Sequence, residues 1–257
     1  MRKSLFNWVA GLLSLALLWF SVVPATAETT VGSNVDSRVV LAFKANDEAI
    51  QANLPDGWGL LTLPNGPLAG SNLLVSFIDR HLALDAEGKP LAPHSDRSVA
   101  LLAYGVKPGV EGARMFVLRV FEMPPVASSY DNGIAASISR EFTLTGSADD
   151  TRTHQEVWRI EPETGGVLGL DLTYRSGRPG WSSSEAMPYS AVNPDFHRIY
   201  RYDQLVDLAM SAALGRELNG DIQLQSSIPE FAGVFDGDES LTGILVIPVY
   251  VREVLLP

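Results

Sequence analysis

The chain has 257 residues, of which 46% are hydrophobic and 19% are charged, a composition typical of folded proteins and not of disordered ones. Its formal net charge of −11 argues against nucleic acid and anionic lipid as partners, because an acidic surface repels phosphate groups. The absence of cysteine excludes disulfide bonds, thiolate metal sites and thiol catalysis.

Residues 1–27 have the pattern of a secretory signal peptide. Arg2 and Lys3 form a short basic region, and the segment from Trp8 to Val23 is almost continuously apolar. Ala25 and Ala27 supply the small residues that a signal peptidase accepts, so we expect cleavage after Ala27. The alternative is an uncleaved membrane anchor. After cleavage no stable membrane insertion is expected, because no later segment has the ~20 apolar residues that span a bilayer. The mature protein is therefore expected to be periplasmic or secreted.

The mature chain is expected to begin with a flexible leader over residues 28–40, because Glu28 to Ser37 is polar and lacks periodicity. Leu41 to Leu54 has apolar and polar residues on opposite sides of a helical period, which predicts a short amphipathic helix. The turn residues Pro55, Asp56 and Gly57 end this helix.

From Trp58 onwards the pattern is mostly that of strands separated by glycine and proline. The expected strands are Trp58–Leu63, Leu73–Ile78, Ser98–Val106, Arg114–Phe121, Ala136–Thr145, Gln155–Glu161, Val167–Arg175, Phe196–Tyr202, Asp221–Ser226 and Leu241–Val254. This regular spacing predicts one β-rich α+β domain over residues 41–257, built on a curved antiparallel sheet or barrel.

Three other segments of this domain have patterns of their own. Gln204–Leu214 and Pro229–Phe235 are predicted to be short helices. The segment Arg175–Pro188 is long and polar, which predicts a surface loop that exposes Trp181.

Motifs for metal binding and nucleophilic catalysis are absent from the sequence. The four histidines, His81, His94, His154 and His197, are scattered singly, without the close spacing of metal ligands. There is no serine nucleophile elbow and no glycine-rich phosphate loop. We therefore expect no metal site and no cofactor.

Arg140 stands out within the predicted strand Ala136–Thr145. It shares one face of that strand with apolar side chains, whereas serine, threonine and Glu141 take the other face. An arginine in such a place must be paired, reach solvent or hold an anion. It could clamp a carboxylate, and the alternative is a structural ion pair with a glutamate or an aspartate, with Glu122, Glu141 or Glu161 as the partner. Arg119 also projects from an apolar face.

Three segments resemble a known family. They are Leu54–Trp58, with the sequence LPDGW, the run from Tyr130-Asp131-Asn132 to Arg140-Glu141, and the C-terminal half with its closing strand Leu241–Val254, which matches in the order of its elements only. Their order and sequence are similar to those of the acetoacetate decarboxylase-like superfamily, with the central match the most specific. The resemblance covers most of the mature chain and implies a β-rich cone or barrel around a mostly apolar cavity.

The resemblance also implies a chemistry that this chain lacks. The family forms a Schiff base on a lysine a few residues after the pair that corresponds to Arg140-Glu141. Here the corresponding segment, Phe142 to Asp150, contains no lysine, and the mature chain has only Lys44, Lys89 and Lys107. Schiff-base decarboxylation is therefore not expected.

Three functions stay open at this point. The first is an exported protein that binds a small or lipid-like carboxylate without covalent chemistry, through Arg140, Tyr130, Asn132 and Arg119. The second is a lyase, hydratase or cyclase with a general acid or base chosen from Glu141, His197 and Tyr200. The third is a structural or partner-binding envelope module that uses the Trp181 segment, and an oligomer is compatible with each of the three.

Overall fold

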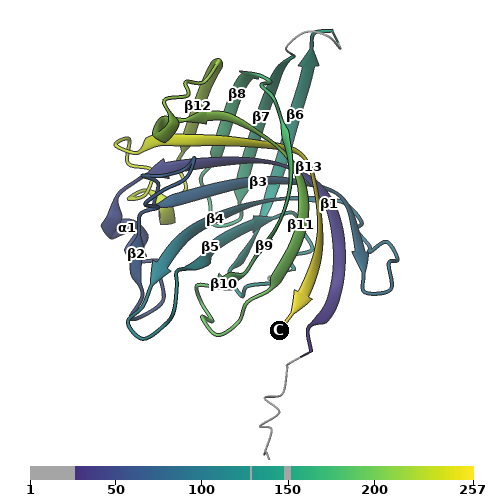
Figure 1. Cartoon of the computed structure of the whole chain (residues 1–257), viewed down its shortest axis with the longest axis vertical. Helices are drawn as coiled ribbons and strands as arrows, with labels where there is room; N and C mark the ends of the chain where they lie inside the picture. Colours follow the sequence, from purple (N-terminus) through teal and green to yellow (C-terminus); the bar gives the residue numbers. More distant parts are fainter. Residues whose placement is uncertain (1–26, 128, 148–151) are drawn as a thin grey trace, which may run out of the picture.

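The computed structural model describes residues 27–127, 129–147 and 152–257 (Figure 1). The predicted signal peptide lies outside these ranges apart from Ala27. Within them, no helix is both long enough and apolar enough to cross a membrane. The helical elements described are α1 (Asp47–Gln51) and two 3₁₀ helices, η1 (Ala212–Leu214) and η2 (Pro229–Phe231).

The described parts of the chain are dominated by strands. Their bounds are β1 Thr29–Lys44, β2 Gly59–Leu61, β3 Leu73–Asp85, β4 Asp96–Val106, β5 Arg114–Glu122, β6 Gly133–Thr145, β7 Thr153–Pro162, β8 Leu168–Arg175, β9 Gly180–Ala186, β10 Pro188–Ser190, β11 Ile199–Ser211, β12 Gly220–Ser226 and β13 Ser240–Leu256.

These strands form one large curved sheet in the order β12-β8-β7-β6-β5-β4-β3-β1-β13-β11-β9 (Figure 1). Neighbours in this order are antiparallel except β5 and β6, which pair in parallel over three residues. Short strand β2 adds to β4, and β10 adds to β5 in parallel. The sheet is open, since its order begins at β12 and ends at β9. The predicted β-rich fold with a curved sheet and few short helices is confirmed.

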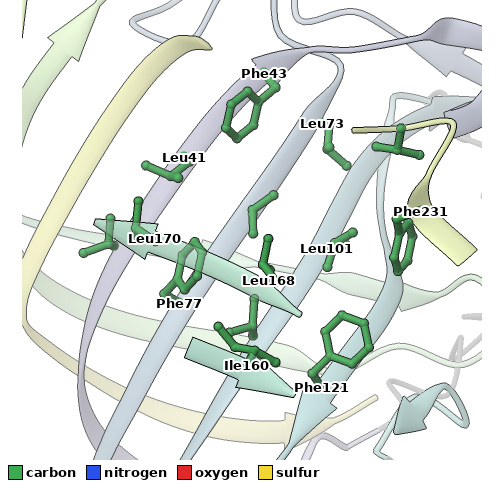
Figure 2. Close-up of a cluster of buried hydrophobic side chains, with 14 of the residues drawn as sticks. Leu41, Phe43, Leu73, Phe77, Leu101, Phe121, Ile160, Leu168, Leu170 and Phe231 are labelled. Carbon is green, nitrogen blue, oxygen red and sulfur yellow. The ribbon is translucent and has the colours of Figure 1, made fainter. Parts of the chain in front are cut away.

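The hydrophobic core lies on one face of the central strands. Alternate residues of β1, β3, β4 and β5 point towards β7 and β8, which cross over them (Figure 2). Ring contacts hold the core together. The ring centres of Phe77 in β3 and Trp158 in β7 are 5.6 Å apart, and those of Phe121 in β5 and Phe231 in η2 are 6.2 Å apart. Because side chains alternate along a strand, the residues between the core positions point to the opposite face of the sheet.

The prediction of a flexible leader over residues 28–40 is wrong. This segment is most of β1, which pairs with β3 on one side and with β13 on the other. The strand pattern is hidden because the polar residues Asn34, Asp36 and Arg38 share one face and hydrogen-bond to one another, while Ser33 and Ser37 interrupt the apolar residues of the other face. The folded domain therefore begins near Thr29 and not at residue 41.

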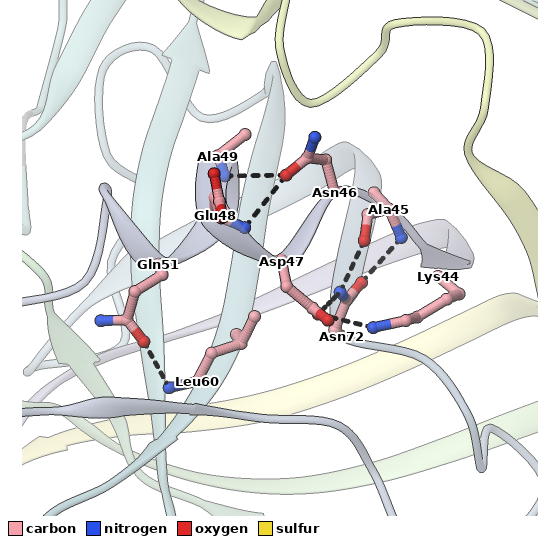
Figure 3. A network of polar contacts seen from close by, with 9 residues as sticks. All are labelled: Lys44, Ala45, Asn46, Asp47, Glu48, Ala49, Gln51, Leu60 and Asn72. Atoms are coloured by element: carbon pink, nitrogen blue, oxygen red, sulfur yellow. Dashed lines mark hydrogen bonds and ion pairs between the residues drawn. The ribbon is translucent and has the colours of Figure 1, made fainter.

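The helix predicted over Leu41–Leu54 is much shorter in the structure, because its first residues complete β1. Helix α1 starts only after Asn46, whose side chain accepts hydrogen bonds from the backbone of Glu48 and Ala49 (Figure 3). Asn72 holds this turn in place through two hydrogen bonds to the backbone of Ala45 and one to Asp47 (Figure 3).

Two other segments also differ from the prediction. The expected helix Gln204–Leu214 is mostly strand β11, because β9 and β13 pair with it on both sides and override its apolar spacing. The expected loop Arg175–Pro188 contains the edge strand β9, although Trp181 is 61% exposed as predicted. The helix expected over Pro229–Phe235 is the single turn η2.

Arg140 of β6 is part of a structural ion-pair network. Its Nη1 lies 2.9 Å from Asp79 Oδ2 of β3, and its Nη2 lies 3.1 Å from Glu156 Oε2 of β7. It also donates a hydrogen bond to Ser37 of β1, and Trp158 donates one to Glu156. The arginine side chain is only 12% exposed, and its contacts link β6 to β1, β3 and β7. Its partners are not the three glutamates considered from the sequence.

Replacing Arg140 with alanine is expected to lower the free energy of unfolding by about 3–5 kcal/mol. The variant would leave Glu156 buried without a cation and Asp79 with only Arg97, which lies 3.2 Å away. Chemical denaturation followed by circular dichroism measures the change.

The matched control for this prediction is Arg159→Ala. Arg159 lies on β7 and pairs with Glu161 at the surface, where its side chain is 58% exposed. An exposed pair contributes about 0–1 kcal/mol, so this variant should unfold almost like the unmodified protein. Equal losses for the Arg140 and Arg159 variants would contradict the structural role of Arg140.

Candidate functional site

A cavity of about 500 Å³ lies on the face of the central strands opposite the core. In β1, Arg38 and Val40 line this cavity, whereas Val39 and Leu41 belong to the core. Strand β11 closes the cavity from the other side with residues that include Tyr200 and Tyr202, and Tyr130 from the segment before β6 joins them. A volume of this size is typical of a site for one small organic ligand.

Four arginine side chains line the cavity: Arg38, Arg80, Arg198 and Arg252. Two of them are neutralised by nearby carboxylates of the protein. Arg38 Nε lies 2.6 Å from Asp36 Oδ1, and Arg80 Nη1 lies 2.8 Å from Asp96 Oδ2. Desolvation acts against the charge of Arg38, but the Asp36 carboxylate outweighs it, so the pKa of this arginine is raised.

Arg198 and Arg252 form no ion pair with a carboxylate in the part of the chain that the structure describes. Arg252 Nε donates a hydrogen bond to Asn34 Oδ1 at 2.6 Å, and its guanidinium carbon lies 4.0 Å from the centre of the Tyr200 ring. Arg198 Nε is buried without a hydrogen-bond partner. Glu122, the glutamate that lines the cavity, accepts a hydrogen bond from the backbone of Ala127. The two arginines are therefore available to an anion.

A pair of tyrosines lies beside these two arginines. The hydroxyl oxygens of Tyr130 and Tyr200 are 2.5 Å apart. Burial disfavours ionisation of both phenols and raises the pKa of Tyr130. For Tyr200, the positive charges of Arg252 and Arg198 outweigh the burial, so its pKa is lowered. Arg38 and the hydrogen bond from Tyr130 act in the same direction. The tyrosine that ionises first is therefore Tyr200.

The structure brings only two of the predicted site residues into the cavity, Tyr130 and Tyr200. Arg140 does not line the cavity, and its charge is already neutralised by protein carboxylates. Glu141 lies on the exposed side of β6, since neighbouring residues of a strand point to opposite faces.

The remaining three predicted residues make contacts outside the cavity. Asn132 is buried and donates a hydrogen bond to the backbone oxygen of Val117 at 2.6 Å. Arg119 pairs with Glu230 at 2.9 Å. His197 stacks on Tyr189, with ring centres 4.5 Å apart.

The cavity arginines were not selected from the sequence, although a pattern was visible. In the segment from Phe196 to Tyr202, aromatic and cationic residues alternate, and Arg198 and Tyr200 share one parity. In the closing strand, Tyr250, Arg252 and Val254 share another single face. The sequence does not show that these two strand faces lie side by side on one wall of the cavity. The pairing of β11 with β13 in the structure shows it.

The three lysines within the described residues all lie outside this cavity. Lys44 pairs with Asp47 at 2.5 Å, and Lys89 is in the turn between β3 and β4. Lys107 follows β4, with its Nζ 5.9 Å from the centre of the Trp58 ring. The described residues also contain no group of three or more side chains able to hold a metal ion.

Neither a protein-family model nor a curated protein sequence matches the chain. Solved structures do match its fold. The enduracididine biosynthesis enzyme MppR in complex with pyruvate matches with a TM-score of 0.53, at 11% identity and over 96% of each chain. An acetoacetate decarboxylase-like enzyme from Sphingomonas wittichii RW1 matches with a TM-score of 0.52, at 11% identity, over 87% of this chain and 91% of that one. The chain therefore has the acetoacetate decarboxylase-like fold.

Proposed function

We propose that this protein is an exported protein that binds a carboxylate ligand in the cavity without covalent chemistry. The observation that carries this proposal is that Arg198 and Arg252 line the cavity without a carboxylate partner among the described residues. Both arginines are half-buried, and a guanidinium matches a carboxylate in shape and charge. The Tyr200 hydroxyl is placed to complete the contacts.

Two further observations support the proposal. Lys44, Lys89 and Lys107 lie outside the cavity, so none of the lysines among the described residues is placed to form a Schiff base with a ligand bound there. One protein with the same fold, MppR, is described in complex with pyruvate, which is itself a carboxylate. Export rests on the signal-peptide pattern that ends at Ala27.

The variant Arg252→Gln is expected to lose most of the affinity for carboxylates. A hydrogen bond to a charged group contributes about 1.5–3 kcal/mol, so the Kd should rise about 10- to 100-fold. The measurement is thermal stabilisation of the protein by a panel of pyruvate, acetoacetate and octanoate.

The matched control for this variant is Arg201→Gln. Arg201 is also an arginine of the sheet, but it lies on the outer side of β11, where it pairs with Glu28 and Glu185. This control should keep the full response to the panel. A response that survives in Arg252→Gln and in the Arg198→Gln, Arg252→Gln double variant would contradict the proposal.

A second candidate function is proton transfer by Tyr200. It is favoured by the short hydrogen bond to Tyr130 and by the arginines that lower the pKa of Tyr200. A phenol with a lowered pKa serves as a general base or acid nearer to neutral pH. Glu141 and His197 lie outside the cavity, so Tyr200 is the predicted acid or base that remains in place.

Ultraviolet titration of the protein is expected to show one tyrosine that ionises below the ordinary pKa of about 10. The sign follows from the neighbouring positive charges, which favour the phenolate. This step should disappear in Tyr200→Phe and persist in Tyr202→Phe. For catalysis, the measurement is deuterium exchange at the carbon between the two carbonyls of acetoacetate. The exchange rate should fall in Tyr200→Phe and not in Tyr202→Phe. An unchanged rate in Tyr200→Phe would rule Tyr200 out as the base.

A further inference from the structure

The polarity of the cavity wall changes along the strands. At one end the lining is mainly apolar and consists of Val40, Leu74, Ala100, Leu102, Val117, Val120 and Leu245, with Ser76 among them. The strand registers place these residues together: Val40 lies opposite Leu245, and Leu74 lies opposite Leu102, which lies opposite Val117.

The other end of the same wall is polar and cationic. Asn34 of β1 lies opposite Arg252 of β13, which lies opposite Tyr202 of β11. Next to this row, Tyr250 stacks on Tyr202 with ring centres 4.8 Å apart. Arg198 and Arg252, which have no carboxylate partner among the described residues, both act on the Tyr200 phenol and therefore belong with the tyrosine pair to this end of the cavity.

The two ends are far enough apart for a long ligand. Asn34 and Val40 lie on the same face of β1, and the usual rise of about 3.3 Å per residue separates them by about 20 Å. Together with the cavity volume of about 500 Å³, this distance exceeds what a ligand of the size of pyruvate would fill.

We propose that the ligand is an amphipathic carboxylate with a medium or long alkyl chain, of the fatty-acid class. Its carboxylate lies against Arg198 and Arg252, and its chain follows β1 towards Val40 and Leu245. This inference rests on the proposed function, because it specifies the ligand class of the same site. Burial of the chain against the apolar wall supplies affinity that the charge contacts alone do not.

The opposite direction for the chain is less consistent with the structure. On the side of the cationic end away from Val40, Leu84 and Leu91 also line the cavity, but Leu91 is 48% exposed. Ala83 and Val254 beside the cationic end are as buried as Leu74 and Ala100 at the inner end. The inward direction therefore rests on the larger number of apolar side chains that line the cavity towards Val40 and Leu245.

The test is isothermal titration calorimetry of the protein with straight-chain carboxylates from acetate to dodecanoate, with pyruvate for comparison. The Kd is expected to fall about two- to fourfold for each added methylene group until the chain fills the apolar end. Dodecanol has the same chain without the carboxylate, and it should bind at least about tenfold more weakly than dodecanoate.

The outcomes separate this inference from the proposed function. If affinity is independent of chain length, or if pyruvate binds more tightly than dodecanoate, the ligand class is wrong and carboxylate binding stands. If none of the carboxylates binds in a manner that Arg252→Gln weakens, both proposals fail. Dodecanol that binds as tightly as dodecanoate would overturn the assignment of the carboxylate to the arginines.

Substitutions in the wall test the direction of the chain. Leu245→Asn at the apolar end should weaken dodecanoate at least about tenfold and leave acetate unchanged. Val249→Asn is the matched control, because Val249 lies on the exposed outer face of the same strand. Ala100→Phe narrows the apolar end and should shorten the best-bound chain. If Leu91→Asn removes the chain-length dependence and the two inner variants do not, the proposed direction is overturned.

Discussion

Strand β1 separates the hydrophobic core from the cavity, and the two sides require apolar and polar side chains respectively. It lies between β3 and β13, so both of its edges are paired, and its side chains alternate between the hydrophobic core and the cavity. Leu41 and Phe43 belong to the hydrophobic core on one face (Figure 2), where Phe43 contacts Phe235. Asn34 and Arg38 carry the polar wall of the cavity on the other. The core and the cavity therefore share one set of backbone hydrogen bonds.

The cost of burying charge decides what each arginine of the domain does. Arg140 and Arg38 have carboxylates of the protein within 3 Å, which neutralise their charges; Arg140 pairs across strands, and Arg38 pairs within β1. Arg252 has a tyrosine ring and an amide as neighbours, and neither Arg252 nor Arg198 pairs with a carboxylate among the described residues. The same residue type is structural in the first case and available for a ligand in the second.

The fold expected from the family resemblance agrees with the structure, whereas most of the expected site residues lie outside the cavity. The motifs around Tyr130 and Arg140-Glu141 indicated the acetoacetate decarboxylase-like fold, and the structural comparisons show that fold. Arg140 was expected to bind a carboxylate ligand. In the structure its charge is neutralised by Asp79 and Glu156, which come from strands distant in sequence. Tyr130, predicted to bind a ligand, and Tyr200, predicted as an acid or base, both line the cavity, although 70 positions separate them in the chain.

Local patterns in the sequence determined the strand-rich class, most strand positions and the absence of lysine from the segment after Glu141, since these depend on neighbouring residues alone. The secondary structure of residues 28–40 and of Gln204–Leu214 was decided by tertiary contacts. Their apolar spacing is ambiguous, and pairing with β3, β13 and β9 makes them strands. The cavity was also decided there, because a curved sheet brings side chains from β1, β11 and β13 to one place. Which arginine pairs with a carboxylate depends on the arrangement of the strands, and the spacing of residues along the chain does not predict it.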